Sequence, residues 1–302
     1  MTTLEFDPLK KSNLEVKRVA LELIEGIHFN LNSEPDQHKA IHESRKLFKK
    51  LRALLRLLKF EIKRKKIFTE DAQFRDLSRK ISPLRDITSL IECLTRLHEK
   101  FPTGSTSSII NECREILFTK RLELEEDANS WEQTLQIVKE ILTKRQKKTS
   151  QWKLTKKLYP SWQKGLEEVY TAGRKSMSYA YKHPSGENFH EWRKNVKYLA
   201  NMVSFMKNAW PPIVETWLQE ISSLATILGE DHDFEMLKEQ LETEHLKLGK
   251  RFHETILHEI LEQEIEQLRK VAYGLGKKIF AEKGKSFSAR IITYYKTSAS
   301  EK

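Results

Sequence analysis

The stretch that decides the fold is IHESRKLFKKLRALLRLLK, residues 41–59. At 100° per residue its apolar side chains gather on one face of a helix, and a row of cations gathers on another, within an arc of roughly 80°. The row repeats at spacings of three and four residues over about 21 Å of helix. Its members are His42, Arg45, Lys49, Arg52 and Arg56, and Lys46 flanks it. The pattern predicts an amphipathic helix that packs through one face and presents cations on the adjacent one.

The same motif occurs a second time, in FHEWRKNVKYL, residues 189–199. Both copies have the order apolar-His-Glu-X-Arg-Lys and lie 148 residues apart, while Asp86-x-x-x-Leu90 is matched by Asp233-x-x-x-Leu237 at an offset of 147. Two matches at nearly one offset predict an internal duplication. The second row is shorter and comprises His190, Arg193 and Lys197, flanked by Lys194.

Helical periodicity extends along the chain, and no stretch alternates as a strand does, so we predict an all-α protein. The run KRQKKTS, residues 144–150, has no apolar periodicity and predicts a junction between a first half, 1–147, and a second half, 148–302. The expected helices span 12–31, 36–66, 83–100, 107–144, 161–183, 187–208, 213–244, 248–274 and 286–296, with a further helical pattern from Trp152.

Charge narrows the choice of partner. The chain of 302 residues has a formal net charge of +11, which favours nucleic acid, anionic lipid or another polyanion. Like charges three or four residues apart on a helix repel by a few tenths of a kcal/mol per pair. A bound polyanion removes that cost and releases its own counterions. Arginine adds planar, bidentate donors for phosphate oxygens, and lysine adds a mobile point charge.

Other features bear on the compartment. Cys93 and Cys113 are the two cysteines, each inside a helical pattern, and we expect them to be reduced thiols. The first 18 residues lack the apolar stretch of a signal peptide, and no window is long and apolar enough to span a membrane. These observations predict a cytoplasmic protein.

Five segments together resemble the CHAD domain family, a family of helical domains named for its histidines. They are residues 41–59, ISPLRDITSLIECL (81–94), GLEEVYTAGRKSM (165–177), FHEWRKNVKYL (189–199) and LGEDHDFEMLKEQL (228–241). The resemblance implies two pseudosymmetric four-helix bundles with a basic groove between them. It also implies binding of inorganic polyphosphate, without catalysis or a cofactor, and association with polyphosphate granules.

The resemblance also implies a set of ligand-binding residues. Ala200 stands where relatives commonly keep another cation, and Thr88 stands where they often have an acid. The first departure bears on the symmetry of the groove. The implied set is His42, Arg45, Lys46, Lys49, Arg52, Arg56, Arg174, His190, Arg193, Lys194 and Lys197.

Two other functions stay open at this point. A nucleic-acid-binding protein would use a similar phosphate-binding groove and would make nucleic acid a competitor, although no base-reading motif is present. A metal-dependent phosphohydrolase would use histidines with Asp231 or Asp233, although no cluster of metal ligands is evident. We expect residues 229–233 to break a helix, and we expect Asp86 and Asp233 each to pair with an arginine of the groove.

Overall fold

The computed structural model describes residues 3–126, 128–243 and 246–300, apart from the side chains of residues 64, 126 and 128–130. In these ranges the chain forms eleven α-helices and one short 3-10 helix, η1, with no β-strand, so the predicted all-α class is confirmed. The elements are α1 (Ser12–Ser33), α2 (Gln37–Leu57), α3 (Arg64–Lys80), α4 (Pro83–Lys100), α5 (Gly104–Glu126), α6 (Ala128–Ser150), α7 (Tyr159–Lys182), α8 (Gly186–Phe205), η1 (Lys207–Ala209), α9 (Pro211–Glu242), α10 (Arg251–Ile279) and α11 (Gly284–Ser298).

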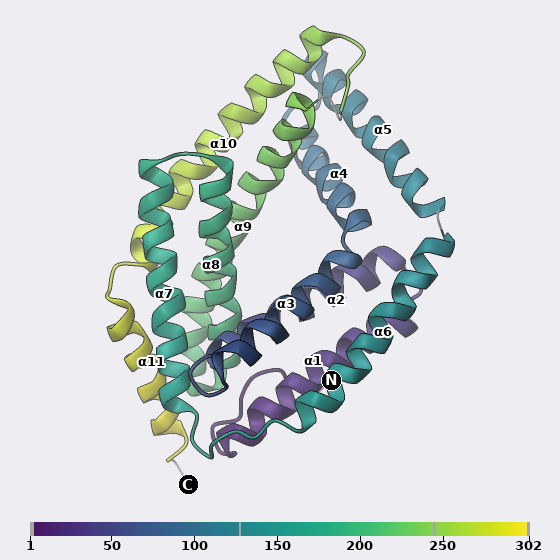
Figure 1. The fold of residues 1–302 in the computed structure, drawn as a ribbon. Helices are drawn as coiled ribbons and strands as arrows, with labels where there is room; N and C mark the ends of the chain where they lie inside the picture. The colour runs from purple at the N-terminus through teal and green to yellow at the C-terminus, as the bar shows by residue number, and fades with distance from the viewer. Residues whose placement is uncertain (1–2, 127, 244–245, 301–302) are drawn as a thin grey trace.

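Two apolar cores hold the helices together, and Figure 1 shows how these helices are arranged. The larger core joins α1, α2, α3 and α6 to α7, α8, α11 and the first half of α9. The smaller core joins α4 and α5 to the second half of α9 and the first half of α10. Each core therefore contains residues from both sides of position 147, which lies in the last turn of α6. The division of the chain into the halves 1–147 and 148–302 stays a prediction.

Helix α9 connects the two cores. Its Leu224 and Leu228 are buried in the larger core, and its Phe234 and Leu237 are buried in the smaller one. The predicted helix break at 229–233 is wrong, because α9 continues through this segment. Asp231 continues the buried face at helical spacing, and Arg269 of α10 neutralises it at 2.7 Å. The polar segment therefore lies between the cores inside one continuous helix.

The predicted helix 36–66 is also wrong in its extent, because α2 ends at Leu57 and α3 folds back beside it. The end of α2 is determined by tertiary contacts. Ser161 of α7 donates a hydrogen bond of 2.7 Å to the Leu57 carbonyl, one of the acceptors that a helix end leaves unpaired. The fold-back brings Phe74 of α3 against Phe48 of α2. A periodic pattern does not reveal either contact.

The predicted helix 107–144 is two helices, α5 and α6. Their apolar residues belong to different cores, since Cys113 and Leu117 of α5 lie in the smaller core and Val138 and Leu142 of α6 lie in the larger one. The run 144–150, which has no apolar periodicity, nevertheless completes α6, and there Arg145 is buried against Glu70 of α3 at 3.1 Å. Residues 151–158 make the connection, so the helical pattern expected from Trp152 is wrong as well.

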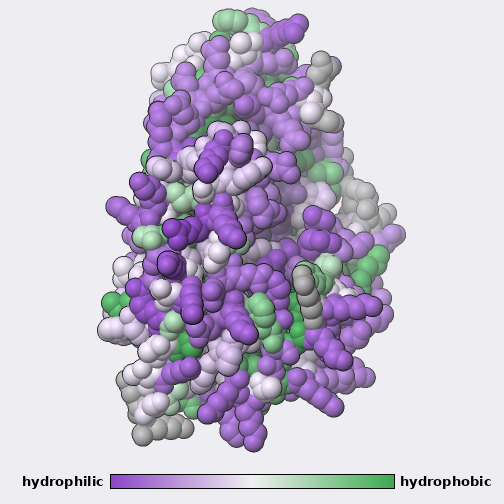
Figure 2. All heavy atoms as spheres, turned by 60° about the vertical axis from the view of Figure 1, so that its left-hand side comes forward, coloured by the Kyte–Doolittle hydropathy of each residue, from purple (hydrophilic) through white to green (hydrophobic). Residues whose placement is uncertain are grey.

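The surface is mostly hydrophilic on the face that Figure 2 shows, with small separate hydrophobic patches. Both cysteines, Cys93 and Cys113, are buried in the smaller core as free thiols. Within the described ranges, no helix is long and apolar enough to cross a bilayer.

We expect Gly165→Ala to lower the free energy of unfolding by about 1–3 kcal/mol. A Cβ at this position would lie 2.7 Å from the Arg56 carbonyl oxygen and 3.1 Å from the Leu57 Cα, where α7 crosses α2. The matched control is Gly274→Ala in α10, where a Cβ meets nothing within 4 Å. The control should stabilise the helix by up to about 1 kcal/mol. Urea unfolding of both variants tests the contact, and equal stability of the two would contradict it.

Candidate anion-binding site

The two helices that carry the duplicated motif, α2 and α8, pack against each other. This contact brings Lys49 of α2 together with Arg193 and Lys197 of α8. Burial, followed by the charges of Lys197 and Arg193, lowers the pKa of Lys49 to about 7. The two copies of the duplicated motif thus meet, and their cations act on each other directly.

The centre of this contact has an excess of positive charge. Lys49, Arg193 and Lys197 are half-buried, and none of them makes a hydrogen bond or ion pair within the described ranges. The Nε atom of Arg193 is fully buried and lacks a partner in the same ranges. Burial lowers the pKa of Arg193, and burial followed by the charge of Arg193 lowers the pKa of Lys197 to about 8. We call Lys49, Arg193 and Lys197 the central cations.

Helix α4 adds two arginines that the sequence analysis missed. Arg85 is near enough to lower the pKa of Lys49 further, after burial and the charges of nearer cations. Arg96 faces α9, with Glu230 at 3.8 Å and Asp233 at 3.7 Å. A signal was present in the sequence, because residues 85 and 96 share one helical face beside the duplicated aspartate, Asp86.

Helix α9 closes the other side of the site with a histidine contact. His232 lies against His190 of α8, with 3.2 Å between the two Nδ1 atoms and 4.3 Å between the ring centroids. Burial, followed by the charge of Arg193, lowers the pKa of His190 to about 4 and that of His232 to about 3. Both rings are therefore neutral near pH 7, and one Nδ1 donates to the other.

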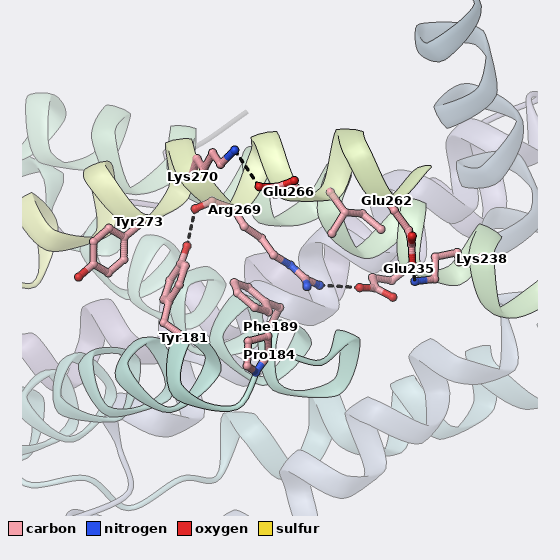
Figure 3. Close-up of a pocket in the computed structure, with 11 residues that line it drawn as sticks. Tyr181, Pro184, Phe189, Glu235, Lys238, Glu262, Glu266, Arg269, Lys270 and Tyr273 are labelled. Atoms are coloured by element: carbon pink, nitrogen blue, oxygen red, sulfur yellow. Dashed lines mark hydrogen bonds and ion pairs between the residues drawn. The ribbon is translucent and has the colours of Figure 1, made fainter. Parts of the chain in front are cut away.

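Asp231 fixes this part of α9 to α10. Its side chain is 1% exposed, and burial raises the pKa of its carboxyl to about 6 despite the charge of Arg269. Arg269 donates to Asp231 at 2.7 Å and to Glu235 at 2.6 Å, and its guanidinium lies over the Phe189 ring at 3.9 Å. Figure 3 shows Arg269 extending past Phe189 toward Glu235, in the wall of a cavity of about 620 Å³. Sequence reasoning missed Arg269 because it lies in a different helix from both motifs.

The far end of the first row is paired. Arg52 and Arg56 both contact Asp71 of α3 at 2.9 Å, and the Arg56 guanidinium lies over the Tyr198 ring of α8 at 3.5 Å. Burial acts to raise the pKa of Asp71, but the hydrogen bonds and charges of the two arginines outweigh it and lower that pKa. The row on α2 is therefore interrupted by an acid from another helix, and Arg52 and Arg56 join α2 to α3 and α8.

Three other predicted residues are also paired. Arg45 donates to Asp86 at 2.9 Å and to the Ser82 carbonyl at 3.2 Å. The expected pairing of Asp86 with an arginine of the groove is therefore confirmed, while the ion-pair partner of Asp233 is Arg96. Lys46 pairs with Glu43 at 3.0 Å, and Lys194 pairs with Glu191.

Two predicted residues lie at the margin. His42 is 45% exposed, with Glu43 at 3.8 Å from its Nε2 atom. Arg174 is exposed on α7, where it donates at 3.3 Å to the Glu282 carbonyl, in the loop before α11. Its contact is with a segment other than α2, α4 or α9, and its place among the ligand-binding residues stays a prediction.

We expect Asp71→Asn to lower the free energy of unfolding by about 1–3 kcal/mol, because two half-buried arginines lose their carboxylate. Affinity for a polyanion should rise a few-fold in the same variant, since Arg52 and Arg56 become available. The control is Asp76→Asn on the same helix, whose carboxylate is exposed and pairs with its neighbour Arg75 at 3.0 Å. The control should change stability by less than about 0.5 kcal/mol. Thermal unfolding of both variants measures the change in stability. An Asp71→Asn variant as stable as the control would contradict a structural role for the pairs of Asp71 with Arg52 and Arg56.

The chain matches the model of a known protein family. A family model described as the CHAD domain matches residues 28–242. The match begins near the end of α1 and extends to the end of α9, so it includes both helices that carry the duplicated motif and the polar segment of α9. A comparison with curated proteins found no match. Because the family match covers more than two thirds of the chain and both copies of its motif, the protein belongs to the CHAD domain family.

Proposed function

We propose that this protein binds inorganic polyphosphate, without cleaving it, along the contact between α2 and α8. The observation that carries the proposal is the set of central cations, Lys49, Arg193 and Lys197, none of which makes an ion pair or hydrogen bond with a carboxylate in the described ranges. Burying like charges without partners costs free energy unless a ligand compensates for it. Phosphate oxygens supply that compensation through charge-assisted hydrogen bonds.

A polymer fits the arrangement better than a single phosphate does. Cations extend from the central set toward Arg45 and Lys46 along α2, and toward Arg85 on α4. A chain with one negative charge on each phosphate can contact several of them at once, and each neutralised phosphate releases a counterion. We propose that the groove follows this path between the two halves of the duplication, as two pseudosymmetric bundles would allow. We further propose that the protein is cytoplasmic and associates with polyphosphate granules.

Competition tests the proposed ligand. Labelled long-chain polyphosphate bound to the protein is challenged with unlabelled polyphosphate, RNA and DNA at equal phosphate concentration. We expect the nucleic acids to compete at least about ten-fold more weakly, because the residues of the site that the structure describes offer no platform for stacking bases. Equal or stronger competition by RNA or DNA would make the protein a nucleic-acid-binding protein instead.

A second assay tests the absence of catalysis. Release of inorganic phosphate from polyphosphate is measured with Mg²⁺ or Mn²⁺ present. We expect no turnover, since Asp231 is tied to Arg269 at 2.7 Å and Asp233 faces Arg96 at 3.7 Å. Turnover that is lost in Asp231→Asn or Asp233→Asn would show a phosphohydrolase.

A further inference from the structure

The two lysines among the central cations lie on α2 and α8, which pack against each other, and both side chains are half-buried without a hydrogen bond or ion pair in the described ranges. Lys49 faces Arg45 on its own helix, Arg193 and Lys197 on α8, and Arg85 on α4. Lys197 faces Arg193 on its own helix and Asp233 on α9. His232 of α9 lies close enough for the charges of both lysines to lower its pKa. Asp233 thus faces the central cations from α9, while Asp86 pairs with Arg45 and Glu92 pairs with Arg85, each at 2.9 Å.

A cluster of cations can lower its positive charge by releasing protons. An arginine keeps its proton at any pH that a folded protein experiences, whereas a lysine can release one. The excess positive charge therefore lowers the pKa values of the two lysines. Burial comes first and the neighbouring cations second, and together they lower the pKa of Lys49 to about 7 and that of Lys197 to about 8. At pH 8 the free protein holds Lys49 largely neutral and Lys197 about half neutral.

We propose that Lys49 and Lys197 take up protons when the site binds its polyanion, so that affinity falls as the pH rises from about 7 to about 10. The inference rests on the proposed function and adds a regulation to it. An anionic chain beside the two amines favours their charged form and returns their pKa values toward the ordinary range, near about 10.4. Binding at pH 8 then takes up about one to two protons, and each added pH unit weakens affinity by roughly 10- to 100-fold.

The other titratable groups of the site change their protonation at lower pH. Burial raises the pKa of Asp231 to about 6, and it lowers the pKa values of His190 and His232 to about 4 and about 3. A polyanion would raise all three, so their proton uptake adds to binding mainly below the window of the lysines. Protonation of the polymer itself is kept small by using long chains, in which terminal phosphates are few.

Calorimetry of the full chain at pH 8 tests the inference. Long-chain polyphosphate is titrated into the protein in buffers of different ionisation enthalpy, and the slope of heat against that enthalpy gives the number of protons taken up. The matched variant is Lys49→Arg/Lys197→Arg, which keeps both charges but cannot release protons. We expect one to two protons for the wild type and close to none for this variant, which should also keep its affinity at pH 9. The control, Lys270→Arg/Lys285→Arg, changes two exposed lysines and should behave as the wild type does.

The outcomes separate this inference from the proposed function. Binding at pH 6.5 with no proton uptake at pH 8 would overturn the inference and leave polyphosphate binding in place. Uptake that persists in a folded Lys49→Arg/Lys197→Arg variant would overturn the assignment to these lysines. No binding at any pH would overturn the proposed function itself. Should that variant not fold, NMR titration of labelled lysines in the wild type gives the same answer: two lysine signals should titrate near pH 7 and pH 8 in the free protein and not in the complex.

Discussion

Replacing Arg193 with glutamate is expected to lower affinity for polyphosphate by about 100- to 1,000-fold at moderate salt. The charge of Arg193 acts on both Lys49 and Lys197, and its Nε atom is buried without a partner in the described ranges. The substitution removes a charge-assisted hydrogen bond and puts a carboxylate beside the bound phosphates. Binding is measured by calorimetry at about 100 mM salt, where the electrostatic contribution is still large.

The matched control is Arg174→Glu, which reverses an exposed arginine that the family resemblance places in the same site. Because Arg174 contacts the Glu282 carbonyl on the α11 side of α7, we expect it to change affinity by less than about three-fold. The free Arg193→Glu protein should stay folded, since the new carboxylate relieves repulsion between Lys49 and Lys197. Equal effects of the two reversals would show that net charge alone, and not this site, determines binding.

Replacing Arg269 with methionine is expected to lower the free energy of unfolding by about 3–5 kcal/mol. Methionine keeps much of the volume against Phe189 but leaves Asp231, which is 1% exposed, without its cation. An uncompensated carboxylate in that position must be desolvated or must take up a proton. Since Asp231 precedes His232 and Asp233, polyphosphate affinity should fall in the same variant. Denaturant unfolding measures the first effect, and calorimetry measures the second.

The loss of stability in Arg269→Met should grow as the pH rises. Burial already raises the pKa of Asp231 to about 6, and loss of the arginine raises it further above its unfolded value of about 3.9. A carboxyl whose pKa is raised in the folded state destabilises that state as the pH rises through the folded pKa. The variant should therefore be less destabilised at pH 5 than at pH 8.

Two companion variants complete this test. Lys270→Met removes the neighbouring cation, which pairs with Glu266 at 2.8 Å on the surface, and should cost less than about 0.5 kcal/mol. Asp231→Asn combined with Arg269→Met should recover part of the lost stability, because the buried charge is gone. A double variant no more stable than Arg269→Met would contradict the account of Asp231.

Much of this arrangement follows from patterns within single helices. The apolar face of residues 41–59 predicts α2 and its packing, and Phe48, Leu51, Leu54 and Leu55 are all fully buried. The duplicated motif predicts that His190, Arg193 and Lys197 match the first row. The structure brings the two helices into contact, so Lys49, Arg193 and Lys197 come together as one group of charges.

What the sequence does not reveal lies between helices. Asp71 lies on α3 and pairs with Arg52 and Arg56 of α2, and the sequence analysis did not predict α3 as a separate helix. Arg269 reaches Asp231 from α10, 38 residues further along the chain. The helix ends at Leu57 and Ser150 depend on Ser161 and on the buried pair of Arg145 with Glu70. These contacts depend on how helices pack, which helical spacing alone does not specify.

The measurement that tests the central claim most directly is polyphosphate binding across a salt series, with the wild type beside Arg45→Glu/Arg193→Glu. We expect tight binding by the wild type at about 50 mM salt, with the logarithm of affinity falling linearly and steeply against the logarithm of salt concentration up to about 200 mM. The double variant should bind at least about 1,000-fold more weakly at low salt. Absence of wild-type binding at low salt, or an affinity that this double reversal leaves unchanged, would contradict the assignment of the site to polyphosphate.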